Sequence, residues 1–254
     1  MTVVVAIFCE DGVVVASDSM ITNSMGHLHT TETKGKKIYS MPDTHLFAFA
    51  GDPALAARFR LVLEHGIMPV KESKSHALDY VTSVTTAIIN HFRATMLKEP
   101  FYVETSVSFV HGGQHHCSLF QAELQPRFLD SDHYWSVFGS GKQYADPFLA
   151  FLTDVFCEKK QPNVSTGKFL ATWAVDHAIQ TNTGGVNGPI QMSILQKELD
   201  GSYSIIDQSE QDIEDQIQAI DAAKCALVDW RKMVGGEGRE DPCVPPIPIP
   251  TANA

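Results

Sequence analysis

Residues 2–18 read TVVVAIFCEDGVVVASD, and the predicted fold follows from the pattern of this segment. Two runs of β-branched and apolar residues, 3–9 and 13–18, flank an Asp-Gly pair that favours a tight turn. Both runs are apolar at consecutive positions, which is typical of strands covered on both faces. The stretch therefore predicts a buried β-hairpin, whose second strand returns Asp18 to the beginning of the first strand, beside Thr2.

Outward from this hairpin, the predicted elements come in blocks. Two more strands, 37–41 and 45–50, precede helices at 53–65 and 75–96, while residues 19–35 are expected to form a loop or an irregular strand. Three strands follow at 104–110, 116–123 and 133–139, and then two helices at 146–157 and 166–180. Two strands at 189–197 and 202–207 precede a last helix at 209–233. Blocks of strands and helices argue against a doubly wound parallel sheet and for two sheets packed face to face with helices outside.

The sequence divides into three parts. Residues 1–208 are expected to form one domain, and residues 209–234 a helix that packs on this domain or on a neighbouring subunit. Residues 235–254 hold five of the thirteen prolines and are predicted to form a flexible tail. The apolar side of the helix is formed by Ile213, Ile217, Ile220, Leu227 and Trp230.

Composition excludes several classes of partner. The chain has 19 basic and 30 acidic residues and a net charge of −11, which disfavours nucleic acid and anionic membranes. No apolar run approaches the roughly 20 residues of a membrane helix, and the apolar beginning lacks a basic flank, so a cytoplasmic protein is expected. Five scattered cysteines without C-x-x-C spacing favour reduced thiols.

A metal site is not predicted. His111, His115, His116 and Cys117 form the densest group of possible ligands, but they flank Gly112-Gly113 in what reads as a hairpin between two strands. No H-E-x-x-H or comparable ligand spacing is present. A surface hairpin is therefore the favoured interpretation of this group.

Thr2 is the candidate nucleophile. Initiator methionine is generally removed before a small residue, which would leave Thr2 with a free α-amine. Such an amine, with a pKa of about 8, is a base that can activate the hydroxyl of the same residue. The hairpin brings Asp18 near, and Lys37 begins the next predicted strand, so a buried Asp–Lys pair is expected beside Thr2.

These motifs resemble the proteasome β-subunit family, which are threonine peptidases among the N-terminal nucleophile hydrolases. An Asp follows the threonine after sixteen residues, and Lys-Lys-apolar-aromatic at 36–39 matches the catalytic-lysine strand. FAFAGDPALAARF at 47–59 and FGSGKQYA at 138–145 match the family's Ala-Gly and Gly-Ser-Gly steps. The resemblance covers roughly residues 2–207 and implies an α+β fold, a four-layer αββα sandwich.

The resemblance also implies roles for site residues. Thr2 would attack, Asp18 and Lys37 would set the electrostatics, the Gly51 N–H would bind the oxyanion, and Ser140 would relay a proton. Thr22 would contact the substrate backbone, and the side-chain pocket would be lined by Ile21, Gly35, Tyr39, Phe49 and Pro53.

One departure from the family lies after the fourth predicted helix. The family usually has an Asp there, then two other residues and Ser-Gly, whereas Gln180 replaces the carboxylate in this chain. Thr183 can stand in for the serine hydroxyl, and Asn182 can supply a polar contact. The departure bears on the efficiency of proton transfer rather than on the nucleophile.

The predicted function is that of a threonine-type endopeptidase acting on peptides or unfolded proteins, without metal or organic cofactor. The family implies self-association into rings or open stacks and a possible ATP-dependent unfoldase. Two alternatives remain open: a non-catalytic, proteasome-like scaffold subunit, and a small-molecule amidohydrolase with the same nucleophile.

Overall fold

The computed structural model describes residues 2–25, 28–41, 45–66, 76–95, 102–121, 125–158, 160–182 and 184–235. The chain divides into two compact units, Met1–Gln208 and Ser209–Ala254. In the second unit the described element is helix α5 (Glu210–Gly235). The predicted tail lies, apart from Gly235, outside the described residues.

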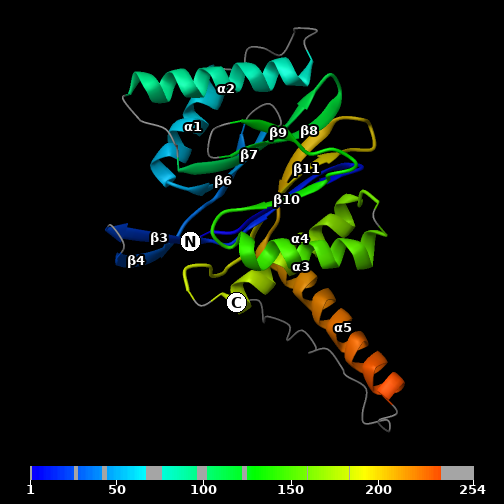
Figure 1. The fold of residues 1–254 in the computed structure, drawn as a ribbon. Helices are drawn as coiled ribbons and strands as arrows, with labels where there is room; N and C mark the ends of the chain where they lie inside the picture. Colours follow the sequence, from blue (N-terminus) through cyan, green and yellow to red (C-terminus); the bar gives the residue numbers. More distant parts are fainter. Residues whose placement is uncertain are drawn as a thin grey trace, which may run out of the picture. The chain divides into compact units, whose positions relative to one another are not determined.

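Two five-stranded antiparallel sheets form the first unit (Figure 1). The first sheet has the order β10 (Trp135–Phe138), β1 (Val4–Cys9), β2 (Gly12–Ser17), β11 (Gln191–Lys197) and β12 (Tyr203–Asp207). The second has the order β5 (Ile38–Met41), β6 (His45–Gly51), β7 (Val103–His111), β8 (Gln114–Phe120) and β9 (Pro126–Phe128). A separate hairpin pairs β3 (Met20–Met25) with β4 (Leu28–Lys34).

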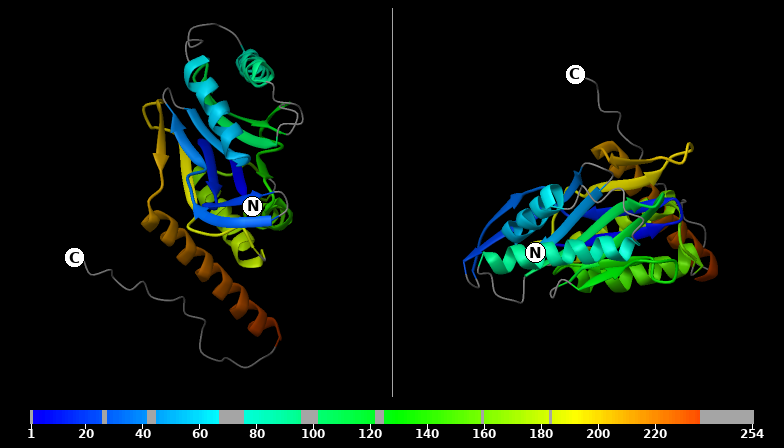
Figure 2. Two further views of the ribbon diagram at one scale, coloured as in Figure 1. Left: turned by 90° about the vertical axis from the view of Figure 1, so that its left-hand side faces the viewer. Right: turned by 90° about the horizontal axis from the view of Figure 1, so that it is seen from above.

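Helices cover the outer face of each sheet, as the two further views in Figure 2 show. Helices α1 (Pro53–Gly66) and α2 (Ala77–Ala94) lie over the second sheet, and α3 (Lys142–Cys157) and α4 (Val164–Thr181) lie over the first. The layer order is helix, sheet, sheet, helix. The predicted four-layer αββα sandwich is therefore confirmed.

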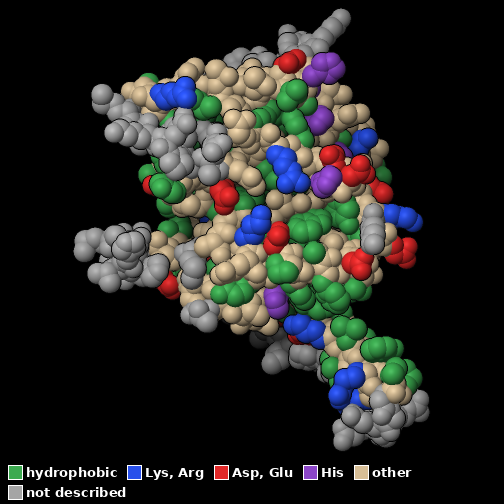
Figure 3. Space-filling model, in the orientation of Figure 1, with side chains coloured by type: hydrophobic (Ala, Val, Ile, Leu, Met, Phe, Trp, Pro, Cys, Tyr) green, Lys and Arg blue, Asp and Glu red, His purple; other side chains and the backbone are tan. Residues whose placement is uncertain are grey.

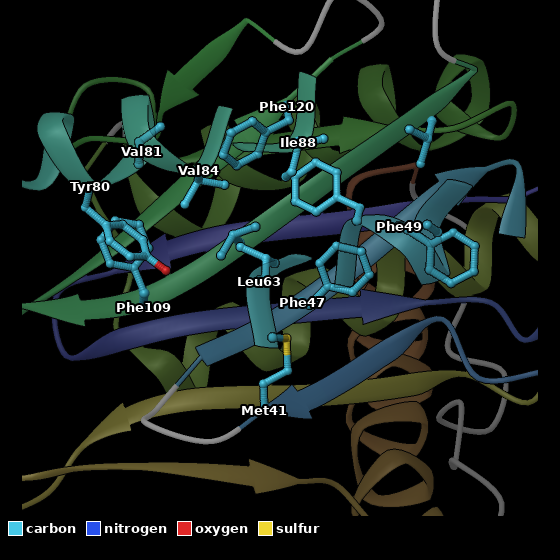
Figure 4. Packing of buried hydrophobic residues seen from close by; sticks show 14 of the residues in the cluster. Met41, Phe47, Phe49, Leu63, Tyr80, Val81, Val84, Ile88, Phe109 and Phe120 are labelled. Carbon is cyan, nitrogen blue, oxygen red and sulfur yellow. The ribbon is translucent and has the colours of Figure 1, made fainter. Parts of the chain in front are cut away.

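Hydrophobic side chains of the described residues pack between the layers, and two of the clusters bear on the site. The inner core lies between the sheets and contains small and branched side chains, among them Val4, Ala6, Val15, Ala48 and Leu119. The outer core lies between the second sheet and its helices and is rich in aromatic rings, with Phe47, Phe59, Tyr80, Phe109 and Phe120 among its members (Figure 4). Small residues in the inner core allow the two sheets to approach closely, because side-chain volume sets their separation.

The decisive hairpin forms as predicted. Strands β1 and β2 pair in register from Val4↔Ser17 to Cys9↔Gly12, and all six residues of β2 are buried. The Asp18 N–H donates to the Val3 carbonyl at 3.3 Å, which continues the pairing by one step. The end of the second strand therefore returns to the beginning of the first.

Several element boundaries differ from the prediction. Residues 19–35 form the paired strands β3 and β4, and the short strand β9 was not predicted. Helix α3 begins at Lys142 rather than at Asp146, because the turn before it already supplies helical hydrogen bonds to the Gly141 carbonyl, and Pro147 lies inside the helix. The Pro147 side chain is exposed to solvent, so the destabilisation that it causes is confined to the helix backbone, where its nitrogen cannot donate a hydrogen bond.

The cysteines follow the prediction only in part. Cys9, Cys117 and Cys157 are buried free thiols. Cys225 on α5 is disulfide-bonded, so the expectation that every thiol is reduced is wrong at this position. Among the described residues, no helix combines the length and the apolar character that crossing a bilayer requires.

Candidate functional site

A buried ion pair stands at the centre of the site. The Lys37 ammonium lies 2.7 Å from Asp18 Oδ1, and the two side chains are 1% and 0% exposed. Asp18 follows β2, while Lys37 precedes β5 in the other sheet, so the pair bridges the two sheets. A buried charge of either sign is costly unless it is paired, which explains why each residue needs the other.

Backbone donors complete the environment of the Asp18 carboxylate. Oδ1 accepts the Val3 N–H at 3.0 Å, and Oδ2 accepts the Met20 N–H at 3.0 Å and the Asn187 N–H at 3.4 Å. These bonds stabilise the ionised carboxylate and fix the strand that carries Thr2.

Lys37 is held through its backbone as well as through its ammonium. The Gln191 side chain accepts the Lys37 N–H at 2.9 Å and donates to the Gly35 carbonyl at 2.7 Å. Burial lowers the pKa of Lys37 from its ordinary value, and the charge of Asp18 and its hydrogen bond counteract this shift.

A glycine-rich turn, residues 139–141, binds the Thr2 backbone through two hydrogen bonds. The Thr2 N–H donates to Ser140 Oγ at 3.0 Å, and the Gly141 N–H donates to the Thr2 carbonyl at 2.8 Å. Gly139 has a φ of +87°, and a Cβ at this position would lie 2.5 Å from the Thr2 carbonyl oxygen. With Met1 attached the Thr2 nitrogen is a peptide nitrogen, and removal of Met1 would convert it into an α-amine next to Ser140.

Gly51 lies where β6 meets α1. Its φ is +99°, and a Cβ there would lie 2.3 Å from the Tyr102 carbonyl oxygen. The Asp52 N–H donates to that carbonyl, while the Phe49 N–H donates to Lys37 on the opposite edge of the strand. Alternation along β6 places the Gly51 N–H on the same edge as that of Phe49, facing away from β7.

These residues meet in one cleft of about 370 Å³. Thr2, Lys37, Gly51 and Ser140 line it, and so do four of the predicted substrate-binding residues, Ile21, Thr22, Phe49 and Pro53. Hydrocarbon from Ile21, Phe49 and Pro53 makes one side of the cleft apolar. Helix α1 begins at this point because Asp52 Oδ1 accepts the Ala54 and Leu55 N–H groups at 2.7 and 3.3 Å.

Four predicted residues that the structure describes do not line the cleft: Asp18, Gly35, Tyr39 and Asn182. Asp18 is buried in its pair with Lys37, and Gly35 packs against the Ile21 side chain. The Tyr39 ring stacks on Phe49 and lies under the Arg60 guanidinium, so it supports the cleft from behind. The Asn182 side-chain amide donates to the Gly184 carbonyl at 2.7 Å and ends α4 locally. Thr183 lies outside the described residues.

Gln180, the residue in place of the family carboxylate, engages its own helix. Its side-chain amide donates to Asp176 Oδ2 at 2.7 Å, one turn earlier on α4. This contact lies on the helix surface, and Gln180 does not line the cleft.

The histidine-rich hairpin has a structural role in this unit. His115 Nε2 lies 2.9 Å from the Cys9 carbonyl oxygen and its Nδ1 lies 3.2 Å from the Tyr203 hydroxyl, contacts that link β8 to β1 and β12. Burial lowers the pKa of His115 and of His116. Within the described ranges, no group of three or more His, Cys, Asp or Glu side chains is arranged to hold a metal ion.

Sequence reasoning missed three polar or aromatic residues of the site. Gln191 holds the Lys37 backbone, Glu104 Oε2 accepts the Gly139 N–H at 2.9 Å, and Tyr102 lines the cleft beside Gly51. No local pattern marks Gln191, which lies 154 residues beyond Lys37 in the chain. For Glu104, the signal was an acidic residue at the beginning of a strand with no other Asp, Glu, Lys or Arg.

Comparison with known proteins agrees with this geometry. The family model described as "Proteasome subunit" matches residues 2–187. A search of curated proteins finds no match. Among solved structures, the chain is similar to a Gly-1 mutant of Anbu from Hyphomicrobium sp. strain MC1, with 15% identity, a TM-score of 0.66 and coverage of 94% of this chain and 99% of that one.

A second structure of Anbu from the same organism matches with 15% identity, a TM-score of 0.65 and coverage of 94% and 98%. At this identity the structural likeness bears on the fold alone, whereas the family model matches most of the chain. The αββα sandwich, the cleft at Thr2 and the match over residues 2–187 lead to one conclusion: the chain belongs to the proteasome subunit family, with the fold of N-terminal nucleophile hydrolases.

Proposed function

We propose that this protein is a threonine-type peptidase whose nucleophile is Thr2 after removal of Met1. The observation that carries the proposal is the convergence of the buried Lys37–Asp18 pair and the Ser140 turn on Thr2 in a single cleft. An ion pair this deeply buried costs desolvation energy, and its position beside a candidate nucleophile favours a chemical role.

In the first half of the reaction, Thr2 Oγ attacks the peptide carbonyl carbon. The hydroxyl proton passes to the Thr2 amine, directly or through the Ser140 hydroxyl, and the Gly51 N–H stabilises the oxyanion. The charge of Lys37 favours the developing alkoxide and keeps the neighbouring amine unprotonated near neutral pH. The Thr2 ammonium then gives its proton to the departing amine, and an ester on Thr2 remains.

In the second half, water attacks the ester carbon. The Thr2 amine now accepts a proton from that water, the tetrahedral intermediate collapses, and Thr2 Oγ leaves with the proton as a hydroxyl. The products are a peptide acid and the restored enzyme. These residues complete the cycle without a metal or organic cofactor.

A covalent test uses a peptide epoxyketone, which needs a hydroxyl and a free amine on the same residue. We expect intact-mass measurement to show loss of Met1, and peptide mapping to place one inhibitor per chain on Thr2. Thr2→Ala is expected to remain unlabelled, and Thr82→Ala, a threonine change on the exposed side of α2, is expected to label as wild type does. A purified chain that keeps Met1 would contradict the proposal.

The scaffold alternative draws on Gln180, which replaces the family carboxylate and binds Asp176 instead of lining the cleft. A scaffold subunit would neither label nor cleave any peptide. A small-molecule amidohydrolase would label but would prefer acylated amines to peptides. Parallel assays with fluorogenic peptides and small acylated amines therefore separate the three functions.

We further propose that the protein self-associates into rings or open stacks, as the family implies, so that the cleft is sequestered from folded proteins. Its substrates would then be peptides or unfolded chains, with an ATP-dependent unfoldase as a possible partner. Mass photometry of the purified protein tests self-association, and pull-down from the source cells with and without ATP tests the unfoldase.

A further inference from the structure

The cleft contains a carboxylate that the proposed mechanism does not use. Glu104 on β7 lines the cleft and is half-buried. Its Oε2 accepts the Gly139 N–H at 2.9 Å, and across the described ranges no Lys, Arg or His pairs with it. Lys37, the other charged residue of the lining, is already neutralised by Asp18. The net charge of the cleft is therefore negative.

Tyr102 lines the same cleft as Glu104. Val103, between them, is 1% exposed and belongs to the outer core, on the side of α1 and α2. Side chains alternate along an extended strand, so the Glu104 side chain points to the opposite side of β7, where it meets Gly139. Tyr102, the residue before β7, lines the same cleft. Tyr102 is 76% exposed, which leaves the faces of its ring accessible.

From this pairing we infer that Tyr102 and Glu104 form a subsite for a basic side chain, Lys or Arg, of a peptide substrate. The carboxylate supplies an acceptor for an ammonium or guanidinium, and the phenol ring supplies a π face for the same cation. The inference rests on the proposed function, and it narrows the substrate class to peptides with a basic residue near the scissile bond.

The existing hydrogen bond of Glu104 is compatible with this role. A carboxylate has two oxygens with about four lone-pair directions, and Gly139 uses one of them. The bond also holds the carboxylate at the wall of the cleft, so little side-chain entropy remains to be lost when a cation binds. The apolar side formed by Ile21, Phe49 and Pro53 accommodates a different residue of the same peptide.

Binding is tested first without cleavage, on the chain that carries Thr2→Ala. Fluorescent hexapeptides carry Lys, norleucine or Glu at one position, and this position is varied along the peptide. The protein is titrated into each peptide, and binding is measured by fluorescence anisotropy. At one position we expect the Lys peptide to bind about tenfold more tightly than the Glu peptide at low salt, and the preference to shrink at high salt. Equal affinities at every position would overturn the subsite.

The carboxylate itself is tested with Glu104→Gln, which keeps an acceptor for the Gly139 N–H and removes the charge, and with Glu104→Lys. We expect the first to bring the Lys-to-Glu ratio close to one and the second to invert it. Tyr102→Leu is expected to reduce the ratio by about threefold, because the cation–π contribution is lost. Glu10→Gln, which removes an exposed carboxylate far from the cleft lining, serves as the matched control and should keep the wild-type ratio.

The same peptides are then tested as substrates of the chain with intact Thr2, with cleavage sites read by mass spectrometry. A preference in kcat/KM that follows the binding ratios and disappears in Glu104→Gln supports the subsite. Cleavage with no such preference contradicts the subsite and leaves the peptidase proposal standing. Absence of cleavage together with a Lys preference in binding contradicts the peptidase proposal and leaves the subsite standing.

Discussion

The Asp18 carboxylate connects the two sheets and the segments on either side of it in the chain. It binds Lys37 from the other sheet and accepts N–H groups from Val3, Met20 and Asn187. The contacts with Lys37, Val3 and Met20 are buried, so the loss of Lys37 leaves a buried carboxylate without a counter-charge. The consequences for stability and for activity can be separated by changing the two charged residues singly and together.

Lys37→Met should leave a buried carboxylate without its cation. We expect the free energy of unfolding to fall by about 3–5 kcal/mol and peptide cleavage to fall below one hundredth of wild type. The double change Asp18→Asn, Lys37→Met should recover most of the stability but none of the activity. Urea unfolding and kcat/KM measure the two effects, and recovery of activity in the double variant would argue against the electrostatic role of the pair.

The lowered pKa of Lys37 predicts opposite responses of stability and activity to alkaline pH. Between the lowered pKa and the ordinary value of 10.5, the unfolded chain binds more protons than the folded chain, so this residue's contribution to the free energy of unfolding rises with pH. Activity requires the ammonium and should decline in the same window. Unfolding and kcat/KM from about pH 8 to 11 should show both trends.

Lys37→Met is the control for that pH dependence. Because methionine does not titrate, the rise in the free energy of unfolding assigned to Lys37 should be absent from this variant. A slope equal to that of wild type would assign the titration to another group.

Gly139→Ala should displace the turn that binds the Thr2 backbone. The added Cβ would lie 2.5 Å from the Thr2 carbonyl oxygen in a backbone with φ of +87°, so the turn must move. We expect activity to fall at least a hundredfold. Gly112→Ala is the matched control, because Gly112 also has a positive φ, +60°, with nothing within 4 Å of the added Cβ. It should cost about 1 kcal/mol of stability and no activity.

At the scale of elements, the beginning of α4 rests on Asn163. Its side-chain oxygen accepts the Thr166 N–H at 2.9 Å, as expected of an N-cap residue. Helix α4 lies over β1 and β2, the strands that carry the site, and most of its residues from Leu170 to Val175 are buried. The cap therefore supports the layer behind the strands that flank Thr2.

Asn163→Ala should lower the free energy of unfolding by about 1 kcal/mol, because one N–H at the beginning of α4 loses its acceptor. Asn163→Asp keeps an acceptor and places a negative charge at the helix N-terminus, so it should retain the stability of wild type. Urea denaturation of both variants at neutral pH is the measurement. A loss in the aspartate variant as large as in the alanine variant would show that the amide group has another role.

At the scale of the whole molecule, the open question is assembly. Figure 3 shows hydrophobic side chains along α5, interspersed with basic ones. The exposed apolar residues in the second half of this helix are Leu227, Val228, Trp230, Met233 and Val234. Exposed apolar side chains in such number are typical of an interaction surface.

If α5 contributes to self-association, Trp230→Glu should reduce the mass of the assembly, because a charge replaces an apolar contact. Ala222→Glu adds the same charge to an exposed position of α5 outside that apolar group and should leave the mass unchanged. Light scattering after size exclusion measures both. Deleting residues 235–254 tests the tail separately, and an unchanged mass would exclude a role of the tail in assembly.

The prediction from sequence was accurate where the physics is local. The blocks of strands and helices, the Asp-Gly turn and the beginning of α1 at residue 53 each depend on neighbours in the chain. It was less specific at residues 19–35, where a loop or an irregular strand was expected and the polar strands β3 and β4 pair with a register shift. It also placed Asn182 at the site, whereas the amide binds a residue two positions away.

The two-sheet architecture and the proximity of Thr2, Asp18 and Lys37 could be predicted from the sequence alone, because a buried hairpin and a following strand leave few ways to arrange these three residues. Only the tertiary structure decided how that group is enclosed. Gln191 and Glu104 come from distant strands, and their contacts with Lys37 and Gly139 form only when the sheets have packed face to face. Such contacts depend on the distance between chain segments in space, which no pattern along the chain encodes.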